Sequence, residues 1–195
     1  MAQDDIGLRI GFIGAGRLAT GLAWALAKRG RTIDAVTSRT AATARRLASR
    51  VPDCRVLATP KALFDASDLV FLTVPDDAIS AQAASLGWRA GMAVVHCSGA
   101  TEVATLTPAA RQGAQIGGFH PLQSFGDPDV AVRTLPGCAI AIEADEPLRA
   151  RLEELAAVVG CRPIRLPAGS RARYHAAAHY AAGFVFALIN EAAEI

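Results

Sequence analysis

The feature that most constrains the fold is a glycine-rich turn between an apolar run and a segment with helical periodicity. The run Leu8 to Ile13 leads into Gly14-Ala15-Gly16, after which leucine and alanine residues recur at helical spacing until Gly30. A strand that enters a helix through so tight a turn is typical of a β-α-β unit in a parallel sheet. The turn therefore predicts an α/β protein.

The same alternation of strand and helix patterns continues along the chain. Further strands are expected at 32–36, 56–57, 69–74, 93–97, 116–119, 139–142 and 163–166, with helices at 42–50, 61–66, 78–85, 102–112 and 148–159. The run Leu69 to Val74 is hydrophobic throughout, as expected of a strand buried on both faces. This order predicts a doubly wound, mostly parallel sheet with helices on both of its faces.

Composition excludes several classes of protein. The chain has 195 residues, of which 52% are hydrophobic and 19% charged, and these values rule out intrinsic disorder. The formal net charge of +2 is too balanced for a nucleic-acid-binding protein that is recognised by charge. The most apolar stretch, Tyr174 to Ile189, is interrupted by His175 and His179 and is shorter than the roughly 20 residues of a membrane span. No membrane partner is expected.

The cysteines and the amino terminus indicate a cytoplasmic protein. Cys54, Cys97, Cys138 and Cys161 are widely spaced, without the close pairs of a disulfide framework or a zinc ribbon. They are expected to be reduced thiols. Residues 1–5 are acidic where a secretory signal peptide would be basic.

The glycine turn has the pattern of a dinucleotide-binding site. Gly14-Ala15-Gly16-Arg17-Leu18-Ala19 reads G-x-G-x-x-A, in which the first glycine permits the tight turn and the second lets a pyrophosphate approach the backbone. Arg17 supports this interpretation, because a cation in the first turn of a helix is unfavourable unless an anion lies beside it. The alternative is a glycine-rich turn that only packs. The predicted cofactor contacts here are Gly14, Ala15, Gly16, Arg17 and Leu18.

The end of the second strand indicates which dinucleotide is bound. NAD-binding proteins place an Asp or Glu there to hold the ribose 2′-hydroxyl, whereas this chain has Ser38 and Arg39. Both side chains can donate hydrogen bonds to a 2′-phosphate, and arginine can do so with two donors. The predicted cofactor is therefore NADP rather than NAD. The alternative for Arg39 is an ordinary solvated side chain, and the missing acid also argues against an adenosylmethionine-dependent methyltransferase.

Three polar segments follow neighbouring strands and should meet at the carboxyl edge of the sheet, where ligands bind. They are Val74-Pro75-Asp76-Asp77, His96-Cys97-Ser98-Gly99-Ala100 and His120-Pro121-Leu122-Gln123-Ser124-Phe125. Val74, Pro75 and Ser98 are expected beside the nicotinamide. Ser98 and Gly99 are candidates to donate to a carboxylate or a carbonyl of the substrate.

His120 is a candidate proton donor, because the unperturbed pKa of histidine lies near 6.5. Its alternative role is to brace a loop before Pro121. His96 lies inside a strand and is expected to be structural. A zinc site of His96, Cys97 and His120 has no evident fourth ligand, and no metal is predicted.

The last segment differs from the rest of the chain. From Ser170 nothing interrupts a helix for 26 residues, and its faces are apolar nearly all round, so it should be buried against other helices or another subunit. Glu191 and Glu194 oppose the macrodipole at its end, and no Gly or Pro stop follows. We expect residues 1–169 to be an NADP-binding domain. Residues 170–195 would start a truncated helical domain through which the protein forms a homodimer.

Two histidines on this helix share one face. His175 and His179 are spaced i, i+4, as metal ligands on a helix can be, although H-A-A-A-H lacks the glutamate of a zinc protease motif. The alternative is that they are packing or interface residues. His175 lies near the start of the helix and can reach back toward the nicotinamide, so it is a third catalytic candidate beside Ser98 and His120.

Five segments together carry a resemblance: GFIGAGRLATGL, TVPDDAI, HCSGA, GGFHPLQSF and YHAAAHYAAGF. In this order they resemble an uncharacterised bacterial family with a Rossmann domain followed by a helical domain of unknown function. That family is similar to ketopantoate reductase, pyrroline-5-carboxylate reductase and deazaflavin-dependent NADP oxidoreductase. The resemblance covers essentially the whole chain and implies NADP binding, reductase or dehydrogenase chemistry, and dimerisation through the helical domain.

Two positions depart from that family. Arg171 stands where relatives carry a lysine, and Ala182-Gly183 stands where they carry Ser-Asn. Arginine keeps the charge but is a poor proton donor, since its pKa exceeds about 12. The first hypothesis is an NADP-dependent oxidoreductase of a small carbonyl, imine or hydroxy acid, with Ser98 and Gln123 positioning the substrate and His120 or His175 handling the proton. The alternative is a non-catalytic dinucleotide-binding or sensing module.

Overall fold

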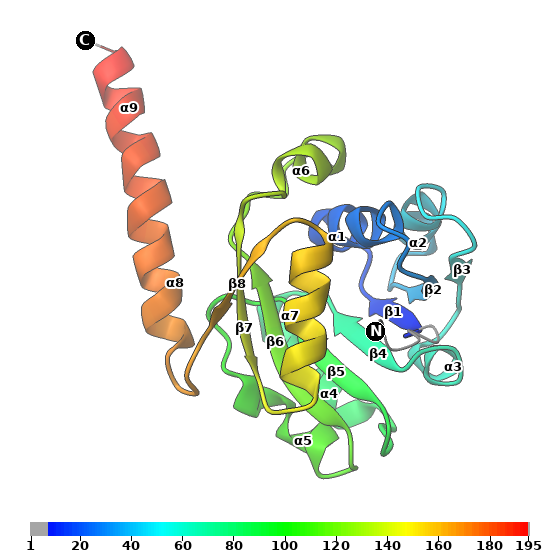
Figure 1. Cartoon of the computed structure of the whole chain (residues 1–195). Coiled ribbons are helices and arrows are strands. Elements are labelled where there is room, and N and C mark those ends of the chain that lie inside the picture. The colour runs from blue at the N-terminus through cyan, green and yellow to red at the C-terminus, as the bar shows by residue number, and fades with distance from the viewer. Residues whose placement is uncertain (1–7, 195) are drawn as a thin grey trace, which may run out of the picture.

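The strands of residues 8–194, the part of the chain that the computed structural model describes, form one eight-stranded sheet (Figure 1). They are β1 (Ile10–Ile13), β2 (Ile33–Thr37), β3 (Arg55–Val56), β4 (Leu69–Leu72), β5 (Ala93–His96), β6 (Gln115–Pro121), β7 (Ala139–Ala144) and β8 (Arg162–Arg165). Their order is β3-β2-β1-β4-β5-β6-β7-β8, and only β6 and β7 pair antiparallel within these residues. The predicted mostly parallel sheet is confirmed. Residues 1–5, on which the expectation of no signal peptide rests, lie outside the described residues.

Helices connect the strands and continue beyond the last one. They are α1 (Arg17–Ala27), α2 (Ala41–Ala48), α3 (Pro60–Phe64), α4 (Asp76–Ser85), the 3₁₀ helix η1 (Val103–Leu106), α5 (Thr107–Ala110), α6 (Pro128–Thr134), α7 (Leu148–Val158), α8 (Arg171–His179), the π-helical segment η2 (Tyr180–Phe184) and α9 (Val185–Ala193). Over residues 8–194 none of these helices has the length and apolar character that a membrane crossing requires.

Two helices differ from the sequence-based expectation. The helix expected over 102–112 is divided into η1 and α5, because Pro108 lacks an N–H group and is accommodated in the first turn of a new helix. The helix α6 was not predicted, since its segment has too few apolar residues to show a period. Its start is fixed by Asp127, whose carboxylate accepts the N–H groups of Asp129 and Val130.

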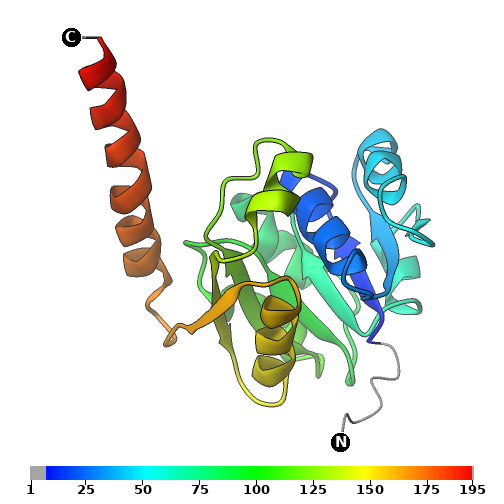
Figure 2. The same ribbon diagram turned by 45° about the horizontal axis from the view of Figure 1, so that its top comes forward.

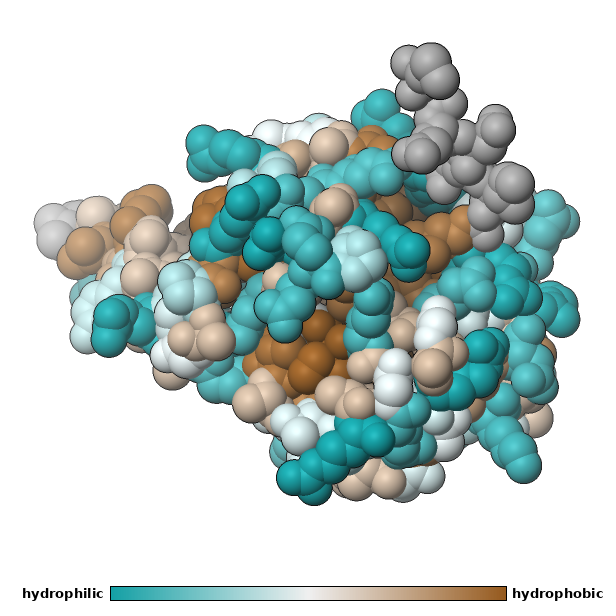
Figure 3. Space-filling view, turned by 60° about the horizontal axis from the view of Figure 1, so that its bottom comes forward, coloured by the Kyte–Doolittle hydropathy of each residue, from teal (hydrophilic) through white to brown (hydrophobic). Residues whose placement is uncertain are grey.

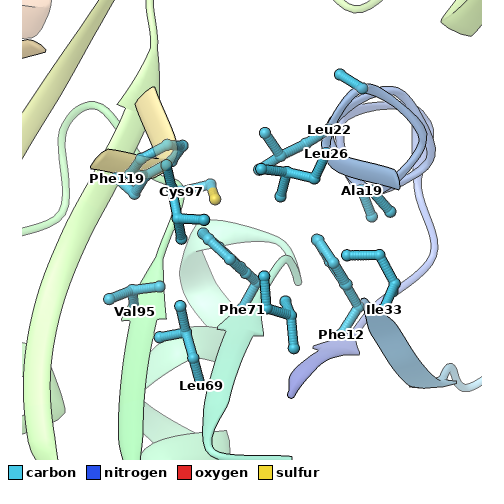
Figure 4. Packing of buried hydrophobic residues seen from close by; sticks show 14 of the residues in the cluster. Phe12, Ala19, Leu22, Leu26, Ile33, Leu69, Phe71, Val95, Cys97 and Phe119 are labelled. Atoms are coloured by element: carbon cyan, nitrogen blue, oxygen red, sulfur yellow. The ribbon is translucent and has the colours of Figure 1, made fainter. Parts of the chain in front are cut away.

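Each face of the sheet has its own core. The helices α1, α2 and α7 cover one face and α3, α4 and α5 the other, as the two clusters of buried side chains show. In the first cluster the rings of Phe12 and Phe71 stack with centroids 5.1 Å apart, and Phe119 meets Phe71 edge-on at 5.5 Å (Figure 4). The aromatic row lies across β1, β4 and β6 and fixes the spacing of the strands that end at the candidate site.

The terminal helix, formed by α8, η2 and α9, projects away from the sheet in both views (Figures 1 and 2). It carries large exposed apolar side chains, and Figure 3 shows hydrophobic surface on it at the left of the molecule. These side chains are Tyr180, Phe184, Val185, Phe186, Leu188 and Ile189. The predicted long helix is therefore present, with a π-helical segment that its sequence did not indicate. Within the described chain, its apolar surface is not covered.

Candidate functional site

The glycine turn lies where the strand order reverses. The strand β1 has β2 on one side and β4 on the other, so the turn at 14–16 opens at a topological switch point. Gly14 has φ 102°, and a Cβ there would overlap the carbonyl oxygen of Thr73. A Cβ on Gly16 would meet no atom within 4 Å. Only glycine fits the first position, and the second leaves open space above the backbone.

The residues that follow the turn start α1 as the sequence predicts. Ala19 is fully buried against the sheet, so α1 packs closely, and Ala15 is buried as well. Arg17 is exposed in the first turn of α1, and Leu18 is half-buried. An anion bound at this turn would therefore meet both the amino end of the eleven-residue helix α1 and the exposed guanidinium of Arg17.

Ser38 and Arg39 follow the neighbouring strand, at the same edge of the sheet. Ile13 and Thr37 are partners in the β1–β2 register, which places both segments side by side. The Ser38 hydroxyl lies 3.0 Å from the Thr43 hydroxyl, at the start of α2, and Arg39 is exposed. The structure therefore brings the two predicted cofactor-binding segments together.

Ser98 ties two loops of this edge together. Its hydroxyl donates to Oδ2 of Asp76 at 2.6 Å and accepts the N–H of Thr101 at 2.9 Å. Asp76 directly follows Val74 and Pro75, so the loops after β4 and β5 meet as predicted. The Ser98 hydroxyl, expected to bind substrate, is engaged in this loop contact.

The Gln123 side chain is engaged with α6 and the segment that follows it. Its amide donates to the hydroxyl of Thr134, and its carbonyl oxygen lies 3.5 Å from the thiol of Cys138. The expectation that Gln123 positions substrate is therefore not supported by its position. Its side chain fixes the loop after β6 to α6, an element that the sequence analysis had missed.

Two histidines and a tyrosine converge above Gly99. A Cβ on Gly99 would lie 2.8 Å from Nε2 of His120 and 2.5 Å from Nδ1 of His175. The rings of His120 and His175 meet edge-on with centroids 5.9 Å apart. On its other side Nδ1 of His120 lies 3.2 Å from the hydroxyl of Tyr174. Because Gly99 has no side chain, Nε2 of His120 and Nδ1 of His175 can both lie close to its backbone.

The electrostatics of this cluster keep His120 uncharged. Burial lowers the pKa of His120 to about 4, with further contributions from the nearby His175 and Arg171, while Asp76 acts in the opposite direction. Burial also raises the pKa of Tyr174. At neutral pH the pair is thus a neutral imidazole beside a neutral phenol, which can exchange a hydrogen bond in either direction.

Tyr174 is the residue that the sequence analysis missed. The signal was present, because Tyr174 immediately precedes His175 and lies in the first turn of a helix that follows the sheet. A half-buried tyrosine one position from a candidate catalytic histidine has a polar group that needs a partner. The partner lies 54 positions away, which no local pattern reveals.

His96 and Cys97 lie behind this cluster, inside the sheet. Burial lowers the pKa of His96 to about 3 and raises the pKa of Cys97 to about 12. Neither ring nitrogen of His96 has a hydrogen-bond partner among the described residues. Both side chains are fully or almost fully buried, so neither faces the open edge.

Arg171, at the position where the resembling family carries lysine, is fully buried. Its Nε donates to Oε2 of Glu143 at 2.6 Å and its Nη1 donates to the carbonyl oxygen of Ser98 at 2.8 Å. A cavity of about 450 Å³ opens beyond the ion pair. The cavity is lined by Glu102, Val103, Ala104, Ile116, Glu143, Ala144, Asp145, Arg149, Leu166, Ala168 and Gly169.

Comparison with solved structures identifies related folds. The Bacteroides fragilis protein BF3122, which its name assigns provisionally to the NADP oxidoreductases, is 27% identical with a TM-score of 0.76 over 96% of this chain and 71% of its own. Protein TM1727 from Thermotoga maritima is 24% identical, with a TM-score of 0.70 over 92% of this chain and 65% of its own. A reductive aminase from Aspergillus terreus, solved with NADPH and ethyl-5-oxohexanoate, is 24% identical, with a TM-score of 0.76 over 95% and 65%.

At 24% identity, TM1727 and the reductive aminase share the fold with this chain. The chain spans about two thirds of the length of each of these two proteins. No curated protein sequence matches the chain. The domain of unknown function DUF2520 matches residues 138–195. The Rossmann-like domain matches residues 3–121, which is more than half of the sequence. The chain belongs to the Rossmann-like domain family.

Proposed function

We propose that the protein is an NADP-dependent oxidoreductase that acts on a small carbonyl, imine or hydroxy-acid substrate. One observation carries the proposal: the glycine turn after β1 and the His120–Tyr174 pair at the carboxyl end of β6 lie at the same edge of the sheet. The strands β1 and β6 are three strand spacings apart, about 14 Å, which an extended dinucleotide can bridge. The 27% identity to BF3122, which its name places among the NADP oxidoreductases, supports the same class.

The residues around the switch point fit the cofactor. The open space above Gly16 leaves the backbone accessible to a pyrophosphate, and the N–H groups at the start of α1 would hold it. Ser38 and Arg39 would bind the 2′-phosphate. Val74 and Pro75 would lie beside the nicotinamide. Solved neighbours that contain NADPH support this assignment. When bound, the cofactor supplies or accepts the hydride.

His120 and Tyr174 would handle the proton. When Tyr174 donates its hydroxyl to Nδ1, the neutral imidazole carries its hydrogen on Nε2, the ring atom on the side of Gly99 and His175. A carbonyl oxygen or imine nitrogen bound within reach of Nε2 can take that proton while Nδ1 accepts the proton of Tyr174, and the phenolate that remains regains a proton from solvent, to which the half-buried Tyr174 has access. His175, whose Nδ1 lies near the same side of Gly99, would orient the substrate. Ser98 would act by holding Asp76 and the loop after β4.

We also infer that the protein is a cytoplasmic homodimer assembled through its terminal helix. The support is the row of large apolar side chains on η2 and α9, several of which are more than half exposed. An apolar helix surface of this kind is typical of an interface.

A nucleotide titration tests the cofactor assignment. NADPH should raise the melting temperature of the protein more than NADH does. The variant Gly16→Ala should fold normally, because its methyl group meets no atom within 4 Å, yet it should lose most of the NADPH-dependent shift. The matched control is Gly87→Ala, at an exposed glycine that also has open space around it. The assignment is wrong if neither nucleotide shifts the melting temperature, or if both variants respond like the wild type.

Turnover distinguishes an enzyme from a sensing module. NADPH oxidation is followed with small ketones, imines and keto acids, and NADP reduction with hydroxy acids. We expect turnover with one of these classes and a deep loss in His120→Asn. NADPH binding without turnover on any of them would instead support a non-catalytic module.

A further inference from the structure

We propose that Arg171 is a positioning residue, whose buried guanidinium fixes the first turn of α8 so that Tyr174 and His175 meet His120. It would act through the groups around it and not on the substrate. The catalytic importance of this role rests on the proposed function, whereas the contacts of Arg171 do not depend on it. In this role Arg171 is not a proton donor.

The first support is the set of partners that the guanidinium binds. A fully buried cation is costly unless it is paired and hydrogen-bonded. Arg171 is paired with Glu143 on β7, whose side chain is 11% exposed, and donates to the carbonyl of Ser98 after β5; within the described residues its Nη2 is left without a hydrogen-bond partner. The planar guanidinium donates to both partners in fixed directions. The ammonium of a lysine lacks this fixed geometry. One side chain of α8 therefore joins two strands of the sheet.

The second support is the main chain at the start of α8. The carboxylate of Glu102 accepts the N–H of Arg171 at Oε1 and the N–H of Gly169 at Oε2, each at 3.1 Å. A carboxylate in this position accepts hydrogen bonds from N–H groups that have no partner within the helix. Its negative charge also interacts favourably with the positive end of the helix dipole. Together with the side chain of Arg171, it fixes both the position and the rotation of the first turn. Tyr174 and His175 follow one turn later, so their directions depend on these contacts.

The third support is the strand beneath the guanidinium. A Cβ on Gly118 would overlap Cζ and Nη2 of Arg171, so the side chain can cross β6 only because residue 118 is glycine. His120 lies two positions further along the same strand, on the same side of the backbone. Gly118 thus leaves room for the guanidinium of Arg171, and Gly99 leaves room for the imidazoles of His120 and His175.

The charge of Arg171 has a second effect on the site. The titratable and charged groups around His120 are Tyr174, His175, Asp76, Arg171 and His96, and the guanidinium is among those that lower the pKa of His120. It therefore helps to keep the imidazole neutral, so that its Nε2 can serve as a donor and its Nδ1 as an acceptor.

The test uses the full chain without nucleotide or substrate, so its result does not depend on the proposed function. The protein is labelled with ¹⁵N-histidine, and the four imidazoles are titrated by NMR in the wild type, Arg171→Ala and Arg171→Lys. The control is Arg173→Ala, an exposed arginine on the same helix. We expect the His120 midpoint to rise toward 6.5 in Arg171→Ala, because a displaced α8 would no longer cover the imidazole and burial is the main cause of its lowered pKa, and to remain unchanged in Arg173→Ala.

Chemical rescue separates positioning from a general loss of structure. Millimolar guanidinium should return the His120 midpoint of Arg171→Ala toward the wild-type value, because the cavity lined by Glu102 and Glu143 gives it access to the vacated carboxylate. Sodium chloride at the same concentration should not. In Arg171→Lys we expect a smaller rise, since the charge stays and the paired hydrogen bonds do not. A folded Arg171→Ala or Arg171→Lys variant with a wild-type His120 titration would overturn the proposal.

Discussion

The hydroxyl of Tyr174 lies 3.2 Å from Nδ1 of His120, and the two rings meet edge-on with centroids 5.7 Å apart. One residue belongs to the helix that leaves the sheet and the other to the strand β6. The pair therefore exists only when α8 is seated on the sheet. Its formation links the geometry of the candidate site to the docking of the terminal helix.

Removal of the Tyr174 hydroxyl should impair chemistry without impairing cofactor binding. In Tyr174→Phe we expect kcat to fall about 100-fold or more, the usual contribution of a positioned proton-transfer group. The Kd for NADPH should stay within twofold, because Tyr174 lies beyond the predicted cofactor contacts. Steady-state kinetics and fluorescence titration measure the two quantities.

The matched control is Tyr180→Phe, an exposed tyrosine on the same helix that stacks on Phe184. It should leave kcat unchanged. Equal losses in the two variants would show that the Tyr174 hydroxyl has no specific role.

The glycine turn and the sheet could be predicted because they depend on local rules. A residue with positive φ before a helix must be glycine, and apolar runs of four to six residues indicate buried parallel strands whatever surrounds them. Gly14, the mostly parallel sheet and the meeting of the loops at Asp76 and Ser98 all followed from these rules.

The Arg171 assembly could not be predicted because it depends on long-range contacts. The partners of Arg171 are Glu102, Glu143, Ser98 and Gly118, which lie between 28 and 73 positions away. Nothing in the sequence around Arg171 distinguishes a fully buried guanidinium from a solvated one. The family resemblance implies a lysine at this position, whereas the structure places the arginine side chain in an ion pair.

Arg39 should discriminate NADPH from NADH. In Arg39→Ala we expect NADPH to bind about 10- to 100-fold more weakly, because a hydrogen-bonded charge pair with the 2′-phosphate is lost, while NADH binding changes little. The control is Arg46→Ala, an exposed arginine on α2. Calorimetric titration of both variants with both nucleotides measures the effect. Equal losses for NADPH and NADH would contradict a role in 2′-phosphate binding.

Buried His96 should make the protein less stable in mild acid. Its pKa is about 3 in the folded chain and about 6.5 when unfolded, so below pH 6.5 the unfolded state binds a proton that the folded state does not. The unfolding free energy should therefore fall by about 2 kcal/mol from this residue between pH 7 and pH 5, and His96 should contribute no such change above pH 7.

Urea unfolding at a series of pH values tests this dependence. The variant His96→Leu should lose about 2 kcal/mol less than the wild type between pH 7 and pH 5, whereas the exposed control His179→Gln should follow the wild type. If His96→Leu shows the wild-type slope, the buried imidazole is not the cause of the acid sensitivity.

The apolar surface of the terminal helix should hold two copies of the chain together. Phe186 and Leu188 are each 69% exposed on α9, and burial of such side chains is a main source of interface stability. We expect light scattering to give twice the chain mass for the wild type and a single chain for Phe186→Glu with Leu188→Glu. The control is Val130→Glu on α6, an exposed apolar residue outside the helix, which should remain a dimer. A wild-type protein that stays monomeric at high micromolar concentration would show that this surface does not mediate self-association.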